Sequence, residues 1–90
     1  MNAAERTVLI TNKRGLHARA SAKFVTLASS QAANIEVSKD GSAVAGTSIM
    51  GLMMLGAAMG DSVIISATGD GAHEALTKLV ELVEGKFGED

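Results

Sequence analysis

The chain has 90 residues, of which 47% are hydrophobic, a length and composition that suit one domain with a packed core. Ten acidic residues slightly outnumber eight basic ones, and the lack of cysteine excludes disulfides and thiolate metal sites. The basic residues are scattered and only Phe24 and Phe87 are aromatic, so we expect no nucleic-acid partner.

Membrane and secretory segments are not expected either. Residues 1–5 hold no apolar run that could serve as a signal peptide. The longest apolar stretch, residues 49–59, is interrupted by glycines and is too short to span a bilayer. We therefore expect a cytoplasmic protein without membrane insertion.

The first half of the chain predicts a strand, a helix and a second strand. Residues 7–11 are apolar and β-branched, which favours a strand. Residues 18–30 lack glycine and proline and repeat apolar side chains at helical spacing, which predicts an amphipathic helix. Residues 34–38 alternate polar with apolar side chains, as a half-buried strand does.

The second half begins with a hairpin. Asp40-Gly41 favours a two-residue turn, so residues 42–45 are predicted to form the returning strand. The methionine-rich residues 47–55 predict a short helix, and residues 62–67 a further strand. Residues 72–87 keep one apolar face and predict the last helix. The order β-α-β-β-α-β-α indicates an α+β domain over residues 1–90, with a mostly antiparallel sheet and helices on one face.

The two histidines of the chain are the candidate reactive residues. His73 lies on the polar face of the last predicted helix, and we expect it to be solvated. His17 stands where the first helix begins, a position that usually holds a capping oxygen. The free N–H groups of a helix start favour an anion there, and Arg19 could pair with it. Because neutral imidazole is a nucleophile, His17 could hold a phosphoryl group.

Other catalytic motifs are missing from the sequence. It has no P-loop, no Gly-x-Gly-x-x-Gly after a strand and no histidine pair at metal-ligand spacing, so we expect no cofactor and no metal. A small regulatory module that binds without transferring a group is an alternative function, since fold alone does not decide function. A true enzyme is disfavoured because the partners of a catalytic site are absent.

Two motifs carry a family resemblance. Residues 12–19 read Asn-Lys-Arg-Gly-Leu-His-Ala-Arg and resemble the HPr active-site motif Gly-Leu-His-Ala-Arg-Pro. Residues 47–55 resemble the second HPr motif, which surrounds a regulatory serine. The similarity extends over nearly the whole chain. Ala20 takes the place of the motif's proline, and both residues suit the first turn of a helix.

The resemblance implies a phosphocarrier of a bacterial phosphotransferase system rather than an enzyme. By resemblance, His17 receives the phosphoryl group from Enzyme I and passes it to a IIA-type domain, and Arg19 assists it. Ser48 corresponds to the regulatory serine, which implies a serine kinase as a further partner. The implied fold is an open-faced β-sandwich, with a four-stranded antiparallel sheet and three helices on one face.

The sequence also predicts a docking surface and shows similarity to two branches of the family. The apolar residues expected to meet partners are Leu16, Met50, Met53 and Leu55, although helical spacing predicts that about half belong to the core. We expect a monomer. Residues 12–13 and 85–90 are similar to the nitrogen-related branch, whereas residues 48–51 are similar to serine-regulated carriers. Sugar import and nitrogen regulation both stay open.

Overall fold

Four strands form one antiparallel sheet in the computed structural model, which describes residues 2–89. Across the sheet the order is β1-β4-β2-β3, so β1 and β3 are the edges. The strands are β1 (Ala3–Leu9), β2 (Asn34–Lys39), β3 (Ser42–Ala45) and β4 (Ser62–Thr68). This confirms the predicted four-stranded antiparallel sheet.

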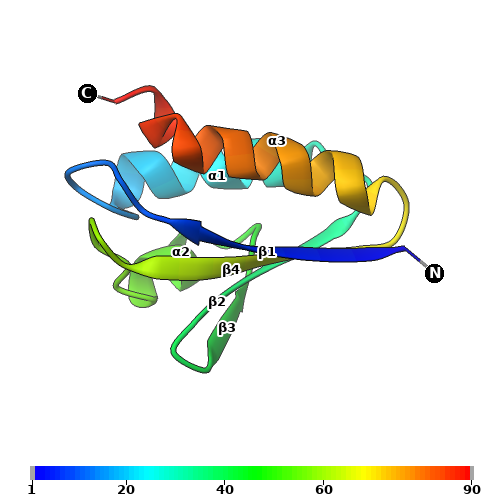
Figure 1. Ribbon diagram of the computed structural model, residues 1–90, viewed down its shortest axis with the longest axis horizontal. Coiled ribbons are helices and arrows are strands. Elements are labelled where there is room, and N and C mark those ends of the chain that lie inside the picture. The colour runs from blue at the N-terminus through cyan, green and yellow to red at the C-terminus, as the bar shows by residue number, and fades with distance from the viewer. Residues whose placement is uncertain (1, 90) are drawn as a thin grey trace.

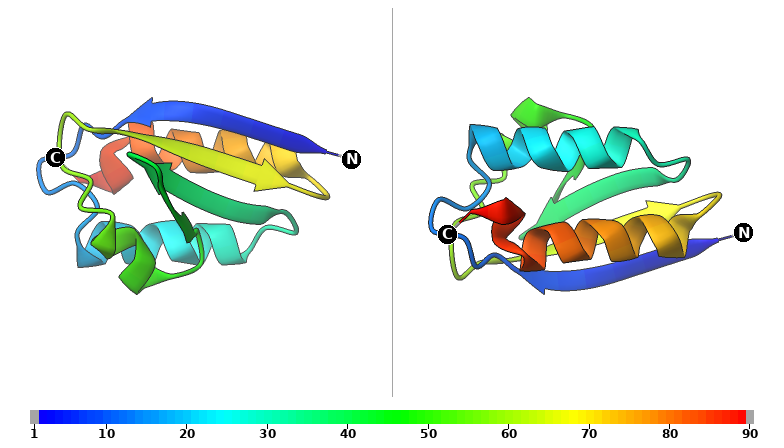
Figure 2. Two further views of the ribbon diagram at one scale, coloured as in Figure 1. Left: turned by 90° about the horizontal axis from the view of Figure 1, so that it is seen from below. Right: turned by 90° about the horizontal axis from the view of Figure 1, so that it is seen from above.

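Two long helices cover one face of the sheet. Helices α1 (Ala18–Ser29) and α3 (Ala72–Glu84) lie side by side, as the views of Figures 1 and 2 agree. The short helix α2 (Ile49–Met54) packs beside the N-terminal half of α1 and contacts β3 (Figure 2). Within residues 2–89, no helix combines the length and the hydrophobicity needed to cross a membrane. The open-faced α+β fold is confirmed.

The core lies between the sheet and the two long helices. Alternate residues of the central strand β4 face it, and Ile65 is completely buried. The helices contribute the apolar rows that their helical spacing predicts. The largest fully buried apolar side chains are Phe24, Phe87, Ile10, Leu52, Ile65, Leu79, Val37 and Val83.

The first strand begins earlier than its sequence predicts. It covers Ala3–Leu9 instead of residues 7–11, because β4 supplies backbone partners as far as the pair Ala3 and Thr68. Alanine and glutamate have low strand propensity, so this long-range pairing overrides the local preference. Ile10 lies beyond the strand, but its N–H donates to the carbonyl of Asp61 over 2.8 Å.

The last helix ends earlier than its apolar pattern predicts. It stops at Glu84, and a 3-10 turn, η1 (Lys86–Gly88), follows. Lys86 and Phe87 both take left-handed backbone angles, with φ of 59° and 56°. The Phe87 side chain is nevertheless buried, and Lys23 Nζ donates to its carbonyl oxygen over 2.7 Å. The chain therefore leaves α3 by a sharp turn over the start of α1.

The loop before α1 is fixed by a close approach at Gly15. This residue has φ of +62°, and a Cβ placed on it would lie 2.3 Å from the carbonyl oxygen of Ala57. The next residue, Leu16, donates its N–H to the same oxygen over 2.9 Å. Only glycine meets both demands, the positive φ and the lack of space. The glycine of the first motif thus sets how the chain enters α1.

Replacement of Gly15 by alanine should therefore cost more than the same change at a matched position. Gly56 has a similar φ of +65° but open space around its Cβ position. We expect Gly56→Ala to lower the free energy of unfolding by about 1–2 kcal/mol, the cost of left-handed backbone. Gly15→Ala should lose about 1–3 kcal/mol more, because the methyl group meets backbone atoms. Urea denaturation measures both, and equal losses would contradict this account of the loop.

Candidate functional site

His17 occupies the N-cap position of α1, as its sequence predicts. Its backbone is extended, with φ of −76° and ψ of −177°, and its Nδ1 accepts the N–H of Arg19 over 3.3 Å. The imidazole nitrogen thus takes the place of the oxygen that usually caps a helix. Because the first N–H groups of a helix have no backbone acceptors, this nitrogen lies in a field that favours negative charge.

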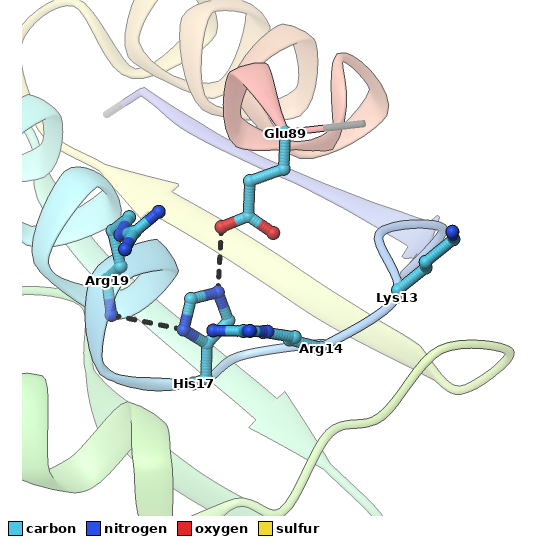
Figure 3. A pocket seen from close by; sticks show the side chains of 5 residues that line it. All are labelled: Lys13, Arg14, His17, Arg19 and Glu89. Carbon is cyan, nitrogen blue, oxygen red and sulfur yellow. Dashed lines mark hydrogen bonds and ion pairs between the residues drawn. The ribbon is translucent and has the colours of Figure 1, made fainter.

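The other ring nitrogen of His17 faces a carboxylate. Its Nε2 points at the carboxylate of Glu89 (Figure 3) and lies 2.7 Å from Oε2. Only 21% of the His17 side chain and 16% of the Glu89 side chain are exposed. An ionised carboxylate accepts hydrogen bonds but cannot donate one. The hydrogen-bond pattern therefore assigns the proton of the neutral ring to Nε2. The lone pair of Nδ1 is left facing the start of the helix.

Glu89 is itself held in place by Asn12. This asparagine is completely buried, and its Nδ2 donates both to Oε1 of Glu89 over 3.1 Å and to the carbonyl of Gly15 over 2.8 Å. The hydrogen bond from His17 lowers the pKa of the Glu89 carboxyl from its ordinary value of 4.5, against the opposing effect of partial burial. The bond from Asn12 and the charges of His17 and Lys23 also lower this pKa.

The surroundings of His17 are basic. Three cationic side chains and one carboxylate line the depression of about 230 Å³ that contains the imidazole; its lining residues are Lys13, Arg14, His17, Arg19 and Glu89 (Figure 3). The positive charges add to the field of the helix start, so the depression suits an anion bound to the ring. The part of the chain from residue 2 to residue 89 offers no group of three or more metal-ligating side chains.

Ser48 lies at a second helix start. It is the N-cap of α2, and its Oγ accepts the N–H of Gly51 over 3.0 Å. This bond satisfies one of the free N–H groups of the short helix. Ser48 is half-buried, and the exposed side chains of Ile49 and Met50 follow it.

The residues predicted to form the docking surface are divided between surface and core. Met50 and Met53 are exposed on α2. Leu16 is corrected from its predicted place on an exposed face, because its side chain packs into the buried core. Leu55 is half-buried and packs against the core. As predicted, His73 is exposed on α3.

Glu89 and Asn12 are the site residues that the sequence analysis missed. Glu89 reaches His17 only because the left-handed turn after α3 redirects the chain, and helical periodicity carries no signal of such a turn. Asn12 belongs to the first motif, but its burial beneath the loop depends on tertiary packing. Lys13 and Arg14 also lie in that motif, and their charge was the available signal of an anion site.

Several known proteins similar to this chain are phosphocarrier proteins. The family model of the PTS HPr component phosphorylation site matches residues 4–85. The phosphocarrier protein HPr of Neisseria meningitidis is 46% identical over 85 residues, which cover 94% of this chain and 96% of that protein. The phosphocarrier protein NPr of Shewanella violacea is 39% identical over 89 residues, covering 99% and 98% of the two chains.

The fold agrees with these sequence relatives. A crystal structure of HPr from Thermoanaerobacter tengcongensis matches with a TM-score of 0.93 and 49% identity, covering 97% of this chain and 98% of that one. Another crystal structure from the same organism holds an HPr dimer. The chain is a phosphocarrier of a phosphotransferase system and not a catalytic enzyme. It belongs to the HPr and NPr family of phosphocarrier proteins.

Proposed function

We propose that His17 carries the phosphoryl group on Nδ1, receiving it from Enzyme I and passing it to a IIA-type domain. The observation that supports this assignment best is the pair of contacts on the ring: Glu89 holds Nε2, and the start of α1 faces Nδ1. In the transfer, the Nδ1 lone pair attacks phosphorus while the bond between phosphorus and the donor breaks. The proton on Nε2 stays in place, so the ring needs no separate base.

The start of α1 stabilises the group once it is attached. When the lone pair of Nδ1 forms the bond to phosphorus, the N–H of Arg19 loses its acceptor and becomes free to donate to a phosphoryl oxygen. The guanidinium of Arg19, which lines the same depression, pairs with the other oxygens. These contacts hold the group on the ring and leave it accessible to the next acceptor, as a carrier requires.

Glu89 acts through the imidazole as a positioning residue. Its carboxylate accepts the Nε2 proton, so it favours the tautomer in which Nδ1 is the nucleophile. After transfer, the ring bears a proton on one nitrogen and the phosphoryl group on the other. The carboxylate then stabilises that positive ring.

Partners are proposed to approach the face that holds His17 and α2. Helix α2 packs beside α1 and presents Met50 and Met53 to the solvent, and flexible thioether side chains adapt to several partners. Because Enzyme I and the IIA-type domain must both reach the same imidazole, one adaptable face serves both. The exchange takes place in the cytoplasm, with residues 1–90 acting as one monomeric domain.

Ser48 is proposed as a regulatory phosphorylation site in addition to its role as a cap. A phosphate there would stay close to the free N–H groups of α2, so the helix need not melt. It would add about 1.5 to 2 negative charges beside the apolar side chains of Ile49 and Met50. Docking would then require desolvation of that charge, which disfavours the complex.

The assignment of His17 is tested by labelling with Enzyme I and phosphoenolpyruvate. We expect an acid-labile, base-stable phosphoryl group on the chain and none on His17→Ala, because no nucleophile remains at the helix start. The variant should lose about 1 kcal/mol of unfolding free energy with its cap but stay folded. His73→Ala removes an exposed histidine from α3 and is expected to label fully. Labelling that persists in the folded His17→Ala variant would contradict the assignment of His17 as the phosphoryl acceptor.

The contact between His17 and Glu89 predicts a dependence of stability on pH. A carboxyl whose pKa is lowered by folding stabilises the folded state above its unfolded pKa, here 4.5. That contribution is lost as the pH falls through the lowered, folded pKa. Compared with Glu89→Gln, the unchanged chain should thus lose more unfolding free energy between pH 6 and acidic pH.

Urea denaturation across that pH range measures the difference between the two proteins. Because the bond from His17 is the largest cause of the shift, the difference should shrink when both carry His17→Ala. A difference that stays constant with pH, or that persists undiminished in the His17→Ala background, would show that Glu89 does not interact with the imidazole as described.

The proposal for Ser48 predicts opposite results for two substitutions. Ser48→Asp should slow phosphoryl transfer from Enzyme I at least about tenfold, since an added charge that must be desolvated on docking costs at least about 1.4 kcal/mol. Ser48→Ala should transfer normally and lose about 1 kcal/mol of unfolding free energy with its cap. Ser29→Asp adds the same charge at the opposite end of α1 and serves as the control. Equal transfer rates in Ser48→Asp and Ser29→Asp would leave Ser48 with its capping role alone.

A further inference from the structure

Four of the five methionines of the chain are exposed in one region. Met50, Met53 and Met54 lie on α2 with exposed fractions of 69%, 41% and 80%, and Met59 in the loop that follows is 58% exposed. These four residues are called the methionine surface below. Methionine is usually a buried residue, and Leu52 of the same helix is completely buried. The exposed methionines therefore lie on one face of α2 and in the loop that follows it, whereas Leu52 lies on the buried face.

Within residues 2–89, the thioether sulfurs of this surface are the accessible oxidisable sulfur atoms. The sequence has no cysteine, so no thiol competes for an oxidant. Hydrogen peroxide transfers one oxygen atom to the methionine sulfur: an S–O bond forms, the O–O bond breaks, and water is released. Sulfur is oxidised by two electrons and the peroxide is reduced. The product, methionine sulfoxide, is polar, and methionine sulfoxide reductases reverse its formation.

The methionine surface is joined to the loop that carries His17. Helix α2 packs against α1, and the loop after α2 touches the His17 loop where Leu16 donates to the carbonyl of Ala57 over 2.9 Å. Figure 2 shows α2 beside the N-terminal half of α1, at whose start His17 lies. From this arrangement we expect a protein that docks on the imidazole to cover part of this surface as well.

We propose that the methionine surface is a reversible oxidation site at which a peroxide-class oxidant slows phosphoryl transfer through His17. This inference rests on the proposed function of His17 and on docking beside it. The sulfoxide puts a strongly polar group where docking removes water, so the complex with the partner is weakened. The fold persists, because these sulfur atoms lie outside the buried core.

The test treats the full chain with hydrogen peroxide and locates sulfoxides by peptide mass spectrometry. We expect Met54 and Met50, the two most exposed, to be oxidised first. Transfer from Enzyme I to His17 should slow at least tenfold, with an unchanged far-ultraviolet circular dichroism spectrum. Treatment with methionine sulfoxide reductases should restore the rate. A variant that carries leucine at all four positions is measured before and after peroxide, and the ratio of its two rates should stay near one.

The outcomes separate this inference from the proposed function. An untreated chain that receives no phosphoryl group from Enzyme I contradicts the proposed function itself. The oxidation inference is overturned when the untreated chain is phosphorylated and the chain oxidised at these four positions transfers equally fast. It is also overturned when peroxide slows the leucine variant as much as the unchanged chain, or when the loss of rate accompanies loss of the folded spectrum.

Discussion

The hydrogen bond between Nε2 of His17 and the carboxylate of Glu89, 2.7 Å long, is the interaction on which the candidate site depends. It joins the start of α1 to the segment after α3, two parts of the chain separated by 72 residues. By occupying one ring nitrogen, it directs the lone pair of the other toward the helix start. The nucleophilic lone pair of the imidazole and the electrostatic field of the helix start therefore meet at the same atom, Nδ1 of His17.

This hydrogen bond depends on a turn whose backbone is strained. Left-handed angles at Lys86 and Phe87 cost about 1–2 kcal/mol each. Burial of the Phe87 side chain, at 1% exposure, returns about 1.5–3 kcal/mol. The charged hydrogen bond from Lys23 to the Phe87 carbonyl adds about 1.5–3 kcal/mol, so the two stabilising contributions match or exceed the backbone cost. Packing and this bond together keep Glu89 beside the imidazole.

Local patterns were sufficient to predict most of the fold and the location of His17. Several predicted features depend only on neighbours within a few residues. They are the hairpin at Asp40-Gly41, the alternation in β2, and the apolar rows of α1 and α3. The edge strand β1 starts at Ala3 because β4 pairs with it, and the last helix stops at Glu84 because Phe87 is buried by a turn. Both depend on residues far apart in the sequence, so local patterns predicted neither the start of β1 nor the end of α3. For the same reason they did not predict the contact of Glu89 with His17.

The central claim is that Nδ1 of His17, at the helix start, receives the phosphoryl group, whereas Nε2 keeps its proton and its hydrogen bond to Glu89. Nuclear magnetic resonance of the phosphorylated chain, with the imidazole nitrogens labelled with 15N, distinguishes them through their coupling to phosphorus. The account predicts that phosphorus couples directly to Nδ1 and that Nε2 carries a proton. A phosphoryl group bonded to Nε2 would contradict it, because that nitrogen would then have lost its contact with the Glu89 carboxylate.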